Sequence, residues 1–227
     1  MLKVPKLTVY MMPGLGASSQ IFERISLPES AFDVVLLEWI EPLPSESLQA
    51  YASRMAQQID APHAVLLGVS FGGILVQEMA AYLPHVGLVI VSSIKCRSEM
   101  PTRLRLISRY KLYRIAPVKW VDKMFILQKW PLPRTIKKRL DLYEIYMNQR
   151  SSNYLNWAIR EVVNWSRTTC DPKVIHLHGD QDAVFTSQML KNYVKVPNGT
   201  HVMILFKYHW FNKYLPQYLQ EAYLKAN

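Results

Sequence analysis

Short, almost uninterrupted apolar runs alternate along this chain with segments in which apolar residues recur every three or four positions. The apolar runs occupy residues 6–12, 32–37, 64–67, 86–91, 173–177 and 193–196. Apolar strands with little alternation are typical of a parallel sheet that helices cover on both faces. A helical repeat follows Pro44, and residues 202–226 predict one helix that Pro216 interrupts. The pattern therefore predicts an α/β fold with about six mostly parallel strands.

The alternation stops after Ser93, where about 75 residues contain no convincing strand. Three helical periods each follow a proline, and a fourth lies further on: they begin near Pro101, Pro117, Pro133 and Leu155. We expect residues 95–170 to form a helical lid. The core would then consist of residues 1–94 and 171–227.

The composition fits one globular domain of 227 residues and 26.4 kDa, half of them hydrophobic. Cys96 and Cys170 lie far apart and lack metal-ligand spacing, so we interpret them as reduced thiols. No apolar run reaches about 18 residues, and the first residues lack a secretory pattern. These features predict a soluble, cytoplasmic protein without metal or cofactor.

The net charge of +10 is concentrated in the predicted lid. Residues 95–170 contain 17 Lys and Arg against five Asp and Glu, whereas the remainder contains 10 against 12. A basic patch attracts nucleic acid, anionic lipid or an anionic substrate. No nucleic-acid motif accompanies it, so we expect no nucleic-acid partner. A solvated surface, an anionic substrate and, less favoured, membrane contact remain open.

Residues 64–73, AVLLGVSFGG, contain Gly-x-Ser-x-Gly at Gly68, Ser70 and Gly72, between an apolar strand and an apolar helix. A chain that turns from strand to helix so abruptly strains its central residue, and small neighbours relieve the crowding. The serine hydroxyl would then point out of the sheet. The N–H of Phe71, in the first helical turn, would be left to bind a developing oxyanion.

Three motifs together resemble the α/β-hydrolase superfamily, specifically its small, lidded serine hydrolases. They are Gly68-Val69-Ser70-Phe71-Gly72-Gly73, then His178-Gly179-Asp180-Gln181-Asp182 after a late strand, and Gly199-Thr200-His201 near the end of the sequence. The resemblance covers nearly the whole chain outside the predicted lid. It implies a six-stranded, mostly parallel sheet without the two N-terminal strands of larger relatives.

The resemblance implies a catalytic triad of Ser70 as nucleophile, Asp182 as acid and His201 as base. Serine is a weak nucleophile at neutral pH, so it needs an imidazole base that a carboxylate orients. All three residues lie just past strand ends, at the sheet edge where sites form.

The turn after the first strand, Pro13-Gly14-Leu15-Gly16, matches the second part of an oxyanion hole. The backbone N–H of Leu15 would join that of Phe71, with Gly14 and Gly16 allowing close approach of substrate. Many relatives have His-Gly where this chain has Pro13-Gly14, a difference that we expect to affect loop packing more than chemistry.

Alternatives remain for the acid and the base. Asp180 follows the same strand as Asp182 and is the rival acid, although the family spacing favours Asp182. His176 and His178 lie in or beside a strand and fit buried, hydrogen-bonded core residues better than catalytic ones. No motif supports a role for three further histidines, which are His63, His85 and His209.

The residues thus predict a serine hydrolase that cleaves a small carboxylic ester or thioester through an acyl-enzyme intermediate. An anionic substrate would suit the basic lid. The same fold also hosts carbon–carbon hydrolases and perhydrolases, and a non-catalytic ligand-binding protein would use the same pocket. The sequence does not choose among these chemistries.

Overall fold

The computed structural model describes residues 5–114, 145–146 and 151–227. In this part of the chain six strands form one sheet in the order β2-β1-β3-β4-β5-β6, and every neighbouring pair is parallel. The strands are β1 (Leu7–Met12), β2 (Phe32–Leu36), β3 (Ala64–Val69), β4 (Gly87–Val91), β5 (Ile175–Gly179) and β6 (Val194–Val196). The predicted α/β class and parallel sheet are confirmed.

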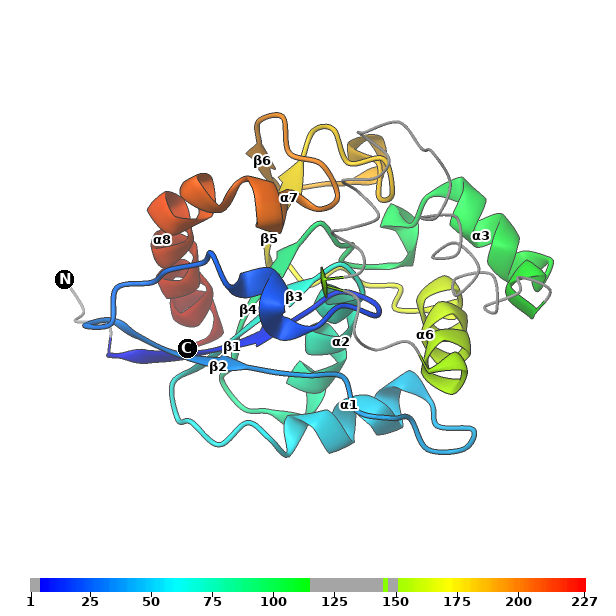
Figure 1. Ribbon diagram of the computed structural model, residues 1–227, viewed down its shortest axis with the longest axis horizontal. Coiled ribbons are helices and arrows are strands. Elements are labelled where there is room, and N and C mark those ends of the chain that lie inside the picture. The colour runs from blue at the N-terminus through cyan, green and yellow to red at the C-terminus, as the bar shows by residue number, and fades with distance from the viewer. Residues whose placement is uncertain (1–4, 115–144, 147–150) are drawn as a thin grey trace.

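Helices cover both faces of this sheet (Figure 1). The α-helices are α1 (Leu48–Ala56), α2 (Phe71–Met79), α3 (Thr102–Arg109), α6 (Ser152–Asn164), α7 (Met203–Phe206) and α8 (Tyr208–Ala226). Short 3-10 helices lie between them: η1 (Ser19–Phe22), η2 (Ala80–Tyr82), η3 (Arg97–Glu99), η4 (Leu112–Arg114) and η6 (Ser187–Met189). Helices α1, α2 and α6 pack in one core, and α7 and α8 in the other.

Strand β1 shows why both faces must be covered. Successive side chains of a strand point to opposite faces. Val9 and Met11 lie in the core beneath α8, whereas Tyr10 and Met12 lie in the core with α1 and α2. All four side chains are buried, which explains the apolar run without alternation.

The C-terminal helical segment differs from its prediction. The break falls at Lys207, between α7 and α8, and Pro216 lies inside α8. Proline removes one backbone hydrogen bond from a helix. Leu215 and Leu219, on either side of Pro216, are fully buried against the sheet, and this packing holds the helix together through the proline.

Between β4 and β5 the described residues contain helices and no strand. The helix predicted after Pro101 is confirmed as α3, and the one around Leu155 as α6. The helices predicted after Pro117 and Pro133 lie outside the described residues. The division into a core and a lid of residues 95–170 stays a prediction.

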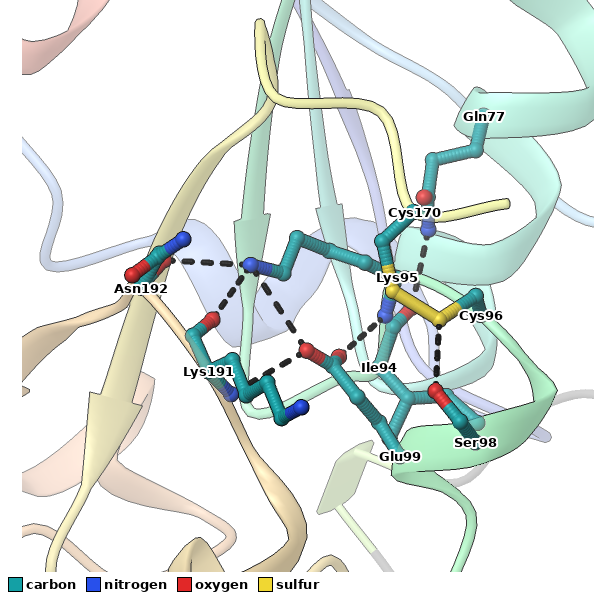
Figure 2. Close-up of a disulfide and its surroundings, with 9 residues drawn as sticks. All are labelled: Gln77, Ile94, Lys95, Cys96, Ser98, Glu99, Cys170, Lys191 and Asn192. Carbon is teal, nitrogen blue, oxygen red and sulfur yellow. Dashed lines mark hydrogen bonds and ion pairs between the residues drawn. A yellow bond between two sulfur atoms is a disulfide. The ribbon is translucent and has the colours of Figure 1, made fainter. Parts of the chain in front are cut away.

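The cysteines form a disulfide, so the prediction of reduced thiols is wrong (Figure 2). Cys96 and Cys170 are 74 positions apart in sequence, yet their Cα atoms are 4.9 Å apart. Sequence separation misleads here because the segment between β4 and β5 leaves the sheet and returns to it at neighbouring points. The cytoplasmic location, which rested partly on reduced thiols, stays a prediction without that support.

A buried polar network lies beside the disulfide (Figure 2). The Lys95 ammonium donates to the carbonyl oxygens of Lys191 and Asn192 and lies 3.6 Å from the Glu99 carboxylate. The same carboxylate accepts the backbone N–H groups of Lys95 and Lys191. The start of the segment between β4 and β5, called the inserted segment from here on, is therefore fastened to the loop before β6 as well as to Cys170.

Replacing either cysteine with serine should lower the free energy of unfolding by about 4 kcal/mol, because a loop of this length is then no longer closed in the unfolded chain. Denaturant unfolding of Cys96→Ser, Cys170→Ser and the double variant measures the effect. The double variant should lose no more than either single variant. Additive losses, or two free thiols titrated in the unreduced protein, would contradict the bond.

None of the helices in the described residues combines the length and apolar character that crossing a membrane requires.

Candidate active site

Ser70 occupies the turn between β3 and α2, in the backbone conformation that its neighbours predict. Its φ is 53° and its ψ is −117°, a region that non-glycine residues rarely adopt. Two hydrogen bonds hold it there: its N–H donates to Val91 O, and Ser93 Oγ donates to Ser70 O at 2.7 Å. The predicted strain is confirmed, and the last residue of β4 together with Ser93 just after it holds the turn in place.

The glycines of the motif are required by close backbone contacts. A Cβ on Gly68 would lie 2.3 Å from Gly72 O, and a Cβ on Gly72 would lie 2.3 Å from Pro13 O. Either contact is far below van der Waals separation. Gly68 thus lets α2 begin directly above β3, and Gly72 lets α2 approach the turn after β1.

Ser70, His201 and Asp182 form a continuous hydrogen-bonded chain. Ser70 Oγ lies 2.9 Å from His201 Nε2, and His201 Nδ1 lies 2.9 Å from Asp182 Oδ2. Ser70 follows β3, His201 follows β6 and Asp182 follows β5, so all three lie at the carboxyl edge of the sheet. His201 is partly exposed beside the ring of Phe185, whereas the Asp182 side chain is fully buried. The three predicted residues are therefore brought together from positions 131 residues apart at most.

The Asp182 carboxylate is held by its own turn. Its Oδ1 accepts the backbone N–H groups of Val184 at 2.7 Å and Phe185 at 3.0 Å. Oδ2 is the oxygen nearer the histidine, at 2.9 Å from His201 Nδ1 against 3.2 Å for Oδ1. Arg103 of α3 donates to the carbonyl oxygens of Ala183 and Val184, so the inserted segment contacts this turn directly.

Asp180, the rival acid, points elsewhere. Its Oδ2 pairs with Lys195 Nζ of β6 at 3.2 Å. His63 bonds to the hydroxyl of Tyr223. In the described part of the chain, His201 is the histidine that hydrogen-bonds to the serine of the motif.

The turn after β1 lies against Ser70. A Cβ on Gly14 would be 3.5 Å from Ser70 Cβ. Phe71 is the first residue of α2, so helix geometry gives its N–H no acceptor within the helix. The N–H of Leu15, on the same turn, meets no acceptor among the described residues. One predicted oxyanion donor, Phe71, is thus in the first turn of α2 next to Ser70, and the other, Leu15, is on the turn after β1.

Residues that sequence reasoning missed hold this turn in place. The Trp39 indole donates to Gly14 O at 2.8 Å and stacks on Phe71 with ring centroids 5.0 Å apart. The Tyr154 hydroxyl, from α6, accepts the Gly16 N–H at 3.2 Å, and burial raises the pKa of this phenol well above its usual value. Neither residue belongs to a motif, and no pattern in the sequence pointed to either of them.

No group of three or more His, Cys, Asp and Glu side chains within the described ranges is arranged to hold a metal ion.

Comparison with known proteins gives one family. A model described as "Alpha/beta hydrolase family" matches residues 9–213. No curated protein matches the sequence.

Several solved structures share the fold at low sequence identity. A putative non-heme bromoperoxidase, BpoC from Mycobacterium tuberculosis H37Rv, aligns with a TM-score of 0.67 and 12% identity over 99% of this chain and 94% of its own. A carboxylesterase structure from the thaumarchaeon Nitrososphaera gargenis gives 0.65 and 15%, over 96% and 91%. The thioesterase RedJ from Streptomyces coelicolor gives 0.56 and 14%, over 95% and 86%. At such identities these neighbours inform the fold alone.

Proposed function

The chain belongs to the alpha/beta hydrolase family, and from this membership and the geometry around Ser70 we propose that it is a serine hydrolase of carboxylic esters or thioesters. The observation that carries the proposal is the hydrogen-bonded chain Ser70–His201–Asp182, with 2.9 Å at both links. A serine in this setting becomes a nucleophile because the imidazole removes its proton as it attacks.

The first half of the reaction would form an acyl-enzyme. Ser70 Oγ attacks the substrate carbonyl carbon while His201 Nε2 accepts the hydroxyl proton. Asp182 stabilises the imidazolium through Nδ1–H. The N–H groups of Phe71 and Leu15 would bind the carbonyl oxygen as it becomes negative, and each such donor contributes about 3 to 4 kcal/mol to the transition state. His201 then returns the proton to the leaving alcohol or thiol.

The second half would release the acid by the same route. Water takes the place of the leaving group, and His201 Nε2 removes one of its protons as the oxygen attacks the acyl carbon. The bond between the acyl carbon and Ser70 Oγ breaks, and the proton returns to the serine. No metal or cofactor is needed in this scheme.

We propose that residues 95–170 act as a lid over this site. Two contacts support the assignment: Tyr154 bonds to the turn that carries Leu15, and Arg103 bonds to the turn that carries Asp182. The surplus of basic residues in this segment favours an anionic substrate. A solvated surface, or a resting place on a membrane, is the alternative role for these charges.

The rival functions are different chemistry on the same fold and ligand binding without turnover. A carbon–carbon hydrolase or a perhydrolase would use the same three residues. The neighbours described as a bromoperoxidase, a carboxylesterase and a thioesterase illustrate this range. A ligand-binding protein would need no aligned serine, imidazole and carboxylate.

A substrate panel tests the proposal. We expect turnover of some members of a series of short and long p-nitrophenyl esters and acyl-CoA thioesters, and covalent labelling by a fluorophosphonate probe. Activity towards anionic substrates should fall steeply with added salt, whereas activity towards neutral esters should not. Labelling without turnover of any ester or thioester would favour the other chemistries. If the protein shows neither labelling nor turnover, ligand binding without catalysis is the function that is left.

A further inference from the structure

Two buried histidines on β5 lie behind Asp182. His176 and His178 are two positions apart, so they share one face of the strand, and both are almost completely inaccessible. His176 Nε2 lies 3.1 Å from His178 Nδ1. His178 Nε2 lies 2.8 Å from Phe185 O and 3.5 Å from Asp182 Oδ2.

The partners fix where the protons sit. A carbonyl oxygen can only accept, so His178 Nε2 carries the proton that bonds to Phe185 O. Burial lowers the pKa of His178, and it lowers that of His176 well below the usual value, so both rings are neutral. His178 Nδ1 is therefore an acceptor, and His176 Nε2–H is its donor. Phe185 O thus sets the tautomer of His178, and His176 donates to the ring nitrogen that is left.

The His178 N–H lies at the closing point of the turn that holds the acid. Asp182 Oδ1 already accepts two backbone N–H groups from this turn. The His178 N–H binds the turn's last carbonyl, Phe185 O, and lies near Oδ2, the oxygen that faces His201. A neutral ring that donates to Phe185 O supports the turn that holds the carboxylate without placing a positive charge beside it.

We propose that His178 is a positioning residue for Asp182, with His176 as the donor that keeps its Nε2–H directed at the turn. The proposal rests on the proposed function, in which Asp182 orients His201. His178 touches no substrate. Its effect reaches the reaction through the placement of the carboxylate.

Two amide substitutions of His178 test the position of the N–H. The amide nitrogen of Gln falls near the place of Nε2, whereas that of Asn falls near Nδ1. We expect His178→Gln to keep kcat within about threefold and His178→Asn to lose about 10- to 100-fold, the range seen when a partner that orients a metal-ligating side chain is removed. KM should be unchanged in both variants, because the side chain at position 178 does not contact substrate.

A spectroscopic signature separates positioning from general damage. The His201 Nδ1 proton, held against a carboxylate, should give a far-downfield proton resonance in the wild type and in His178→Gln. It should weaken or move upfield in His178→Asn. His63→Gln is the matched control, since His63 bonds to Tyr223 and has no link to Asp182; its kcat and resonance should match the wild type.

Failure of this proposal is distinguishable from failure of the proposed function. If wild type reacts with the fluorophosphonate at Ser70 and the Gln and Asn variants turn over equally, His178 is only a core residue. The same conclusion follows if both variants lose activity equally through loss of fold, seen as a common drop in Tm. If wild type does not react at Ser70, the proposed hydrolase itself is wrong.

Discussion

Replacing Ser70 with alanine should abolish fluorophosphonate labelling and lower kcat for any accepted ester by roughly a million-fold, as in serine proteases that lose their nucleophile. The substitution removes the oxygen that lies 2.9 Å from His201 Nε2. Nothing else in the site can replace it, because a water in that place would lack the acyl-enzyme route. Mass spectrometry of the labelled protein and steady-state turnover measure the two effects.

The alanine should be tolerated by the fold. Alanine is as small as serine at the Cβ that the positive φ of position 70 must accommodate. The hydrogen bonds that hold the turn run through the backbone N–H and C=O of this position, which the substitution leaves unchanged. Tm should therefore change little. Ser30→Ala, at an exposed position before β2, is the matched control and should label normally. Persistent labelling of Ser70→Ala would show that another residue is the nucleophile.

Much of the fold could be predicted because its determinants are local. Both faces of β1, β3 and β4 are covered, so their apolar runs are continuous and easy to locate. The strained turn at Ser70 was equally predictable, since Gly68 and Gly72 are required by contacts within about ten residues or with the neighbouring strand. Strand ends then bring Asp182 and His201 to the same edge.

What could not be predicted depends on contacts between distant segments. The bond between Cys96 and Cys170 follows from where the inserted segment leaves and re-enters the sheet, and spacing alone conceals it. The continuity of α8 through Pro216 reflects burial of Leu215 and Leu219. The contact between Tyr154 and Gly16 joins residues 138 positions apart. No periodicity or motif encodes such contacts.

The choice between Asp182 and Asp180 was left open by the sequence, and a pair of substitutions should decide it. Asp182→Asn should lower kcat about 10⁴-fold, the loss found when the triad aspartate of a serine protease becomes asparagine. Asp180→Asn should stay within about threefold of wild type, because this carboxylate pairs with Lys195, whose side chain is largely exposed, and an ion pair to an exposed partner contributes little. Steady-state turnover of one ester by both variants measures the contrast.

The large effect expected of Asp182→Asn comes from a change of tautomer in His201, whose ring proton moves from Nδ1 to Nε2. The backbone N–H groups of Val184 and Phe185 both donate to Oδ1, so the amide oxygen of the new Asn must take that place. Its NH₂ then faces His201 Nδ1, which must act as acceptor and leave its proton on Nε2. An Nε2–H directed at Ser70 cannot receive the serine proton. If Asp180→Asn is the more damaging variant, or if the two are equal, Asp182 does not orient the base.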